Sequence, residues 1–156
     1  MVASESAINI NAFRISNDLF FEQIKPYLAK GQSVKISVAG NSMKPFLQNG
    51  EKITLQPVQE KDLKIGRIIL AKSADIYILH RIVKLSENEV FLAGDGNLAQ
   101  IEKIEQKDII AIANYVERNQ KQVYLYSTEK LYLAKIWFFA RPFRIIINYI
   151  KRIVIK

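Results

Sequence analysis

The chain has 156 residues, of which 49% are hydrophobic, and a formal net charge of +8 at neutral pH. This length and this apolar share are typical of one globular domain and exclude a disordered chain, so we expect no second domain. The absence of cysteine and the single histidine exclude a disulfide framework, a thiolate centre and a typical zinc site, and we therefore expect no metal or other cofactor.

The first predicted element is a helix near the amino terminus. Ser16 is a suitable N-cap, apolar residues follow it at helical spacing, and Gly31 is a helix terminator, so we expect a helix through Lys30. Residues 1–17 contain neither an apolar run near 18 residues nor the pattern of a signal peptide. We therefore expect a cytoplasmic protein, either free or peripheral at the membrane.

Short β-prone runs separated by turn residues follow the helix. The predicted strands cover residues 34–38, 52–57, 67–71, 76–85, 90–93, 108–117 and 123–126. The pattern predicts a mainly β, β-rich α+β fold. We divide the chain into an amino-terminal tail (1–15), a central domain (16–127) and a basic carboxy-terminal segment (128–156).

The carboxy-terminal segment is both basic and apolar. Residues 1–117 carry 14 Lys and Arg against 14 Asp and Glu, whereas residues 118–156 carry nine against one. The polar residues that fall on one side of a helix here are Arg141, Arg144, Asn148, Lys151 and Arg152. This basic amphipathic pattern, with aromatic residues on the apolar side, is typical of a helix that lies in a lipid interface.

Three placements of residues 131–156 stay open: an anionic membrane surface, packing on the protein's own domain or on a second subunit, and a membrane span. A span is the least favoured, because Arg141 and Arg144 would each cost about 2.5–3.5 kcal/mol near its middle and Pro142 would kink it. Nucleic acid is not an expected partner, since the basic residues alternate with bulky aliphatic residues and form no known reading motif.

Three short motifs supply a serine, a histidine and an aspartate in that order. Ser42 follows Gly-Asn, His80 is the only histidine, and Asp95 lies between two glycines. A serine hydroxyl needs a base, and a neutral imidazole is suitable when a carboxylate holds its other nitrogen. Each residue alone is also consistent with a purely structural role, as a turn residue or a structural histidine. Together they predict a catalytic site.

These motifs resemble the signal peptidase and SOS-repressor-peptidase superfamily from about residue 34 to residue 97. The resemblance is to the histidine-containing branch, found in archaeal, endoplasmic-reticulum and sporulation-type signal peptidases. Ser42 matches the nucleophile of the Ser-Met-x-Pro motif, and His80 matches the base of the His-Arg-Val motif, here His-Arg-Ile. Asp95 matches the acid of the Gly-Asp-x-Asn motif.

The resemblance implies a signal-peptidase-like β fold and a serine endopeptidase that cleaves an extended peptide segment through an acyl-enzyme. Ser42 would be the nucleophile, His80 the general base and acid, and Asp95 the group that orients His80. Met43 and Gly40, beside the nucleophile, would contact the substrate. The competing hypothesis is a catalytically inactive module that binds a peptide while docked at a membrane surface.

Two positions depart from the family pattern. Gly40 stands where signal peptidases usually have a serine that helps to form the oxyanion hole. The amide of Ser42 would therefore contribute more to stabilising the oxyanion. The second acidic residue of the histidine branch has one counterpart here, Glu102, whose role the sequence leaves open. Lys72 and Lys84 are nearby alternatives to His80 as the base, but neither lies in a family motif.

Overall fold

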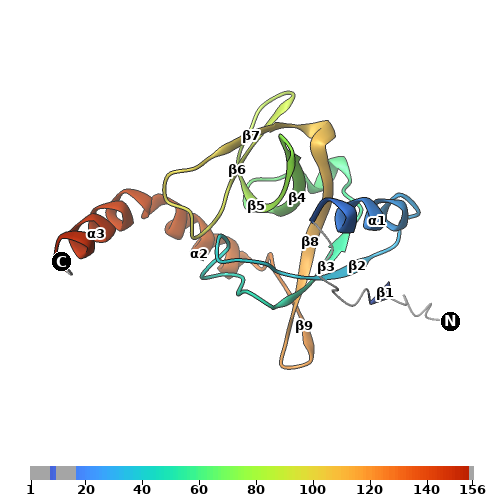
Figure 1. Cartoon of the computed structure of the whole chain (residues 1–156), viewed down its shortest axis with the longest axis horizontal. Helices are drawn as coiled ribbons and strands as arrows, with labels where there is room; N and C mark the ends of the chain where they lie inside the picture. Colours follow the sequence, from blue (N-terminus) through green and yellow to red (C-terminus); the bar gives the residue numbers. More distant parts are fainter. Residues whose placement is uncertain (1–7, 10–16, 155–156) are drawn as a thin grey trace.

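The structure is a computed structural model that describes residues 8–9 and 17–154 (Figure 1). Its helices are α1 (Asn17–Ala29), α2 (Thr128–Phe139) and α3 (Arg141–Val154). Its strands are β1 (Ile8–Asn9), β2 (Val34–Ser37), β3 (Lys52–Gln56), β4 (Ile68–Ser73), β5 (Ile76–Leu85), β6 (Glu89–Ala93), β7 (Glu102–Glu105), β8 (Ile109–Arg118) and β9 (Lys121–Tyr124). The predicted cap Ser16 lies outside the described residues.

The strands form one strongly curved sheet (Figure 1). Their order is β1-β2-β3-β8-β4-β5-β6-β7, and β9 pairs with β8. All pairs are antiparallel except β1 with β2. The expectation of a mainly β, β-rich α+β fold is confirmed. Strands β1 and β7 are additions that the sequence pattern did not predict.

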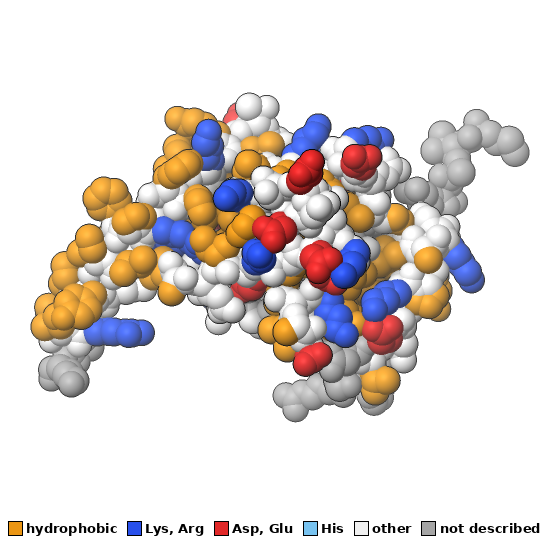
Figure 2. All heavy atoms as spheres, turned by 90° about the horizontal axis from the view of Figure 1, so that it is seen from above, with side chains coloured by type: hydrophobic (Ala, Val, Ile, Leu, Met, Phe, Trp, Pro, Cys, Tyr) orange, Lys and Arg blue, Asp and Glu red, His pale blue; other side chains and the backbone are white. Residues whose placement is uncertain are grey.

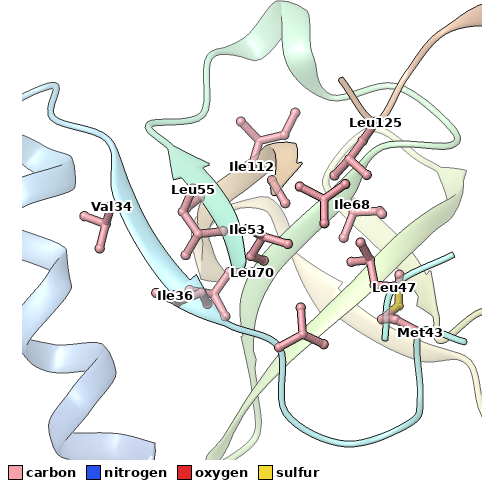
Figure 3. Close-up of a cluster of buried hydrophobic side chains, with 14 of the residues drawn as sticks. Val34, Ile36, Met43, Leu47, Ile53, Leu55, Ile68, Leu70, Ile112 and Leu125 are labelled. Carbon is pink, nitrogen blue, oxygen red and sulfur yellow. The ribbon is translucent and has the colours of Figure 1, made fainter. Parts of the chain in front are cut away.

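Two groups of buried apolar side chains stabilise the fold. The larger group joins β2, β3, β4 and β8 to the loop after β2 (Figure 3). The smaller group, formed mainly by β4, β5, β6 and β7, includes Ile69, Ile82, Leu92 and Ile104. Both groups are made largely of Ile, Val and Leu, whose burial drives folding.

Strand β5 separates the two apolar groups. Ile78 and Ile82 belong to the smaller group, whereas Tyr77 and Leu79 pack against the larger one. Successive side chains of a strand point to opposite faces, so this alternation fixes the directions of the side chains from Tyr77 to Ile82, before the irregularity between Ile82 and Lys84. His80 therefore lies on the same face as Ile78 and Ile82, and Arg81 lies on the opposite face.

The carboxy-terminal segment forms two helices separated at Ala140 rather than one kinked helix. Pro142 is the second residue of α3, where a proline is tolerated because the first amides of a helix have no intrahelical partner. Helix α2 packs on the larger apolar group through Leu131, and α3 then extends away from the domain (Figure 1). None of the described helices is both long and apolar enough to cross a membrane.

Candidate active site

Ser42 lies in the turn-rich connection between β2 and β3. Gly40 has a φ of +83°, a backbone conformation that glycine adopts without steric cost, and its amide donates to Asn49 Oδ1 over 2.8 Å. The carbonyl of Ser42 accepts a 2.7 Å hydrogen bond from the Gly96 amide. This bond fastens the serine turn to the loop that follows β6. Ser42 is half-buried.

His80 is buried on β5 and bonded to a carboxylate. Its Nδ1 lies 3.0 Å from Glu102 Oε2, and each of the two side chains is only 8% exposed. Glu102 begins β7 and lies on the same face as Ile104 of the smaller apolar group. A neutral imidazole that donates from Nδ1 to this carboxylate leaves Nε2 as a hydrogen-bond acceptor.

The acceptor nitrogen of His80 lies beside the serine turn. A Cβ built on Gly94 would be 3.0 Å from His80 Nε2 and 2.7 Å from the Ser42 carbonyl oxygen. The Ser42 carbonyl and the His80 ring therefore both lie against Gly94, and the side chain of Asn97 is the third neighbour, 3.2 Å from the same built Cβ. The structure brings these two predicted residues together, although they are far apart in the sequence.

Asp95 does not orient His80 in this structure. Both of its carboxylate oxygens accept hydrogen bonds from Arg81, over 2.8 Å from Nε and 2.7 Å from Nη2, and the pair is almost fully buried. The physical reason is the alternation of β5: His80 and Arg81 point to opposite faces, so a carboxylate held by Arg81 faces away from the imidazole. The carboxylate that contacts His80 Nδ1 is therefore Glu102 and not, as expected, Asp95.

Met43 also has a different place from the one expected. Its side chain is 2% exposed and belongs to the larger apolar group, so it packs the core instead of lining a substrate groove (Figure 3). Gly40 is exposed beside Ser42. Of the two alternative bases, Lys72 lies over the ring of Tyr77 and Lys84 over the ring of Phe91, and both lysines are exposed.

The carboxy-terminal helices hold the loop that contains Asp95. Trp137 Nε1 donates to the Asp95 carbonyl over 2.8 Å, and Arg144 donates to the same oxygen over 3.1 and 3.2 Å. Arg141 donates to the carbonyls of Gly94 and Asn97. Burial lowers the pKa of both arginines from the usual arginine range. These bonds link the basic segment to the loop beside Ser42, a connection that the sequence does not reveal.

An open cleft of about 370 Å³ lies between the serine turn, the loop after β6 and α3. Lys44 and Pro45 line it on one side, and Arg144, Ile147 and Lys151 on the other. Its charged lining residues are all basic. Through Lys44, Pro45, Gly96 and Leu98 the cleft borders both loops of the candidate site.

The arrangement combines a hydroxyl, an imidazole and a buried carboxylate, which are the groups needed for nucleophilic acyl transfer. Among residues 8–9 and 17–154, no three His, Asp or Glu side chains are grouped as a metal site requires. Comparison of the chain with models of known protein families gives no match, and no curated protein matches it either.

Proposed function

We propose that this protein is a serine endopeptidase of the signal-peptidase type, with the corresponding β fold. The observation that supports the proposal best is the placement of His80, whose Nδ1 contacts buried Glu102 while its Nε2 lies across Gly94 from Ser42. A histidine with a purely structural role needs hydrogen-bond partners for its ring nitrogens. It does not need a serine turn beside Nε2.

In the proposed reaction, Ser42 Oγ attacks the carbonyl carbon of the scissile peptide bond and passes its proton to His80 Nε2. The C–N bond then breaks, and the imidazolium returns the proton to the departing amine. Water repeats the sequence on the acyl-enzyme and releases the acid. Glu102 stabilises the imidazolium and fixes its tautomer throughout.

The amide of Ser42 is a suitable donor to the oxyanion of the tetrahedral intermediate. It donates no backbone hydrogen bond among the described residues, so it is free for this purpose. Gly40, which lacks a side chain, leaves the approach to this amide open. The substrate would be an extended, unfolded peptide segment, because both loops of the site are at the surface and border an open cleft.

Ser42→Ala is expected to abolish peptide hydrolysis without unfolding the protein, since it removes one half-buried oxygen atom. The test is mass spectrometry of products from a library of unstructured peptides with small residues at the candidate scissile bond. Ser86→Ala, on the turn between β5 and β6, is the matched control and should cleave like the wild type. Equal product formation by the wild type and Ser42→Ala would contradict the proposal and favour a peptide-binding module.

Gly94→Ala is expected to separate the serine turn from His80. The new Cβ would meet the Ser42 carbonyl at 2.7 Å and His80 Nε2 at 3.0 Å, contacts that force one of them to move. A displacement of about 1 Å lowers kcat/KM on the order of 100-fold, and overpacking destabilises the fold by about 1–3 kcal/mol. Kinetics and urea unfolding measure the two effects.

The control for this variant is Gly31→Ala, which is remote from the candidate site. Gly31 has a φ of +79° and no atom within 4 Å of a new Cβ, so alanine there costs about 1–2 kcal/mol of backbone strain and nothing else. Its kcat/KM should remain that of the wild type. Full activity of Gly94→Ala would show that the junction between Ser42 and His80 is not a reacting centre.

A further inference from the structure

Helix α3 has two chemically different sides, and its polar side faces the domain. Arg141 is buried and Arg144 half-buried, and both donate to the loop after β6. Asn148 and Lys151, which lie on the same side, line the cleft beside the serine turn. The side of α3 that faces the domain is therefore mainly polar, with Ile147 as the one apolar residue of α3 that also lines the cleft.

The apolar side of α3 faces solvent. Its exposed large side chains are Phe143, Ile145, Ile146, Ile147, Tyr149, Ile150, Ile153 and Val154, each between 47% and 75% exposed. Helix α2 adds Tyr132, Leu133, Ile136 and Phe139, between 49% and 66% exposed. Figure 2 shows apolar side chains gathered at this end of the molecule. We call these twelve residues the outer apolar face.

An amphipathic helix normally turns its apolar side to the protein core, and a monomer rarely exposes a continuous apolar surface of this size. The orientation of α3 is the reverse, and it is fixed by the buried hydrogen bonds of Arg141 and Arg144. Rotating the helix inward would leave those two guanidinium groups without their partners. The outer apolar face must therefore be covered by something other than this domain.

The surrounding charge identifies the occupant. Residues 118–156 contain nine basic residues and one acidic residue, and Lys135 of α2 and Lys151 and Arg152 of α3 are exposed. A second copy of the chain would bring like charges together, whereas an anionic lipid surface brings opposite ones. The four aromatic side chains of this face, Tyr132, Phe139, Phe143 and Tyr149, suit the headgroup region.

We propose that the outer apolar face of α2 and α3 docks on an anionic lipid bilayer, with α3 lying in the plane of the interface. The 14 residues of α3 extend over about 21 Å, less than the hydrocarbon thickness of about 30 Å. The helix thus lies between the bilayer and the loop after β6. This places the candidate active site next to the membrane surface, although docking itself needs neither Ser42 nor His80.

The test is co-sedimentation of the full chain with vesicles of phosphatidylcholine alone and with added phosphatidylglycerol. We expect the wild type to bind the anionic vesicles, with affinity that falls as salt is raised, because the charges are screened. The triple variant Ile146→Ser, Ile150→Ser and Ile153→Ser keeps every charge but removes three exposed apolar side chains. Its affinity should fall at least about tenfold.

The matched control replaces three exposed apolar residues elsewhere: Leu19→Ser, Ile65→Ser and Ile76→Ser, which are 61%, 64% and 61% exposed. It should bind like the wild type. Circular dichroism checks that both triple variants are folded. If the α3 triple variant has lost helix, the deciding measurement is the binding of the wild type to anionic compared with neutral vesicles. Ser42→Ala should also bind normally, which separates this inference from the proposed peptidase activity.

Three results would overturn the inference. The wild type could fail to bind anionic vesicles. The control triple variant could lose as much affinity for anionic vesicles as the α3 triple variant, which would show that vesicle binding is not specific to the outer apolar face. Sedimentation equilibrium could show a dimer that the α3 triple variant dissociates, together with no vesicle binding, and a second copy would then be the occupant.

Discussion

His80→Ala is expected to lower kcat/KM for peptide cleavage on the order of 10⁴- to 10⁶-fold, because the proposed general base is lost. The protein should remain folded because Ile78 and Ile82 keep their packing, although the buried Glu102 carboxylate loses its partner and unfolding free energy should fall by about 1–3 kcal/mol. The effect should equal that of Ser42→Ala, and the double variant should be no worse than either single one. Groups that act as a unit in catalysis show this lack of additivity.

Lysine variants provide the control for this assignment of the base. Lys72 and Lys84 lie against the rings of Tyr77 and Phe91, and their exposed ammonium groups are not in the candidate site. Lys72→Ala and Lys84→Ala should each retain kcat/KM within about twofold, the range of an exposed substitution. Activity that survives in His80→Ala but disappears in either lysine variant would assign the base to that lysine.

The sequence was sufficient to predict most of the sheet. The pattern of residues 76–85 predicts β5 with its full length, because apolar and β-branched residues dominate it and turn residues bound it. The three chemical motifs also mark the two loops and the strand that meet at the candidate site. Order along the chain does not reveal, however, which carboxylate bonds to which partner.

The contact between Glu102 and His80 could not be predicted from sequence periodicity. Strand β7 has four residues, of which only Ile104 is apolar, so it carries almost no hydrophobic signal. Its pairing with β6, in which Leu92 lies opposite Glu102, brings the carboxylate to the face of the sheet where His80 lies. The same alternation places Arg81, to which Asp95 is bonded, on the face opposite His80. The His-Arg dipeptide in the sequence already implies that these two side chains point to opposite faces of a strand.

The orientation of the carboxy-terminal helices was likewise not predictable from amphipathicity. A polar stripe on α3 does not reveal which side faces the domain, and hydrophobic burial alone favours the wrong one. The deciding contacts are hydrogen bonds from Trp137, Arg141 and Arg144 to main-chain carbonyls of the loop after β6. Main-chain acceptors have no sequence signature, so only the folded structure identifies them.

Glu102→Gln and Asp95→Asn should separate catalysis from stability. In Glu102→Gln the amide can donate to Nδ1, which forces the proton of the imidazole onto Nε2 and blocks its use as a base. We expect kcat to fall on the order of 10⁴-fold with little change in unfolding free energy. In Asp95→Asn the buried guanidinium of Arg81 loses its counter-charge, and we expect a loss of about 3–5 kcal/mol in unfolding free energy.

Urea unfolding and steady-state kinetics at a temperature where both variants are folded measure these two effects. A further variant, Asp95→Asn with Arg81→Met, removes the unpaired charge and should recover part of the stability lost in Asp95→Asn, since the two side chains contact each other directly. The opposite pattern, a stable but inactive Asp95→Asn together with an active Glu102→Gln, would mean that Asp95 orients His80 during catalysis. The loop after β6 would then have to leave Arg81 when substrate binds.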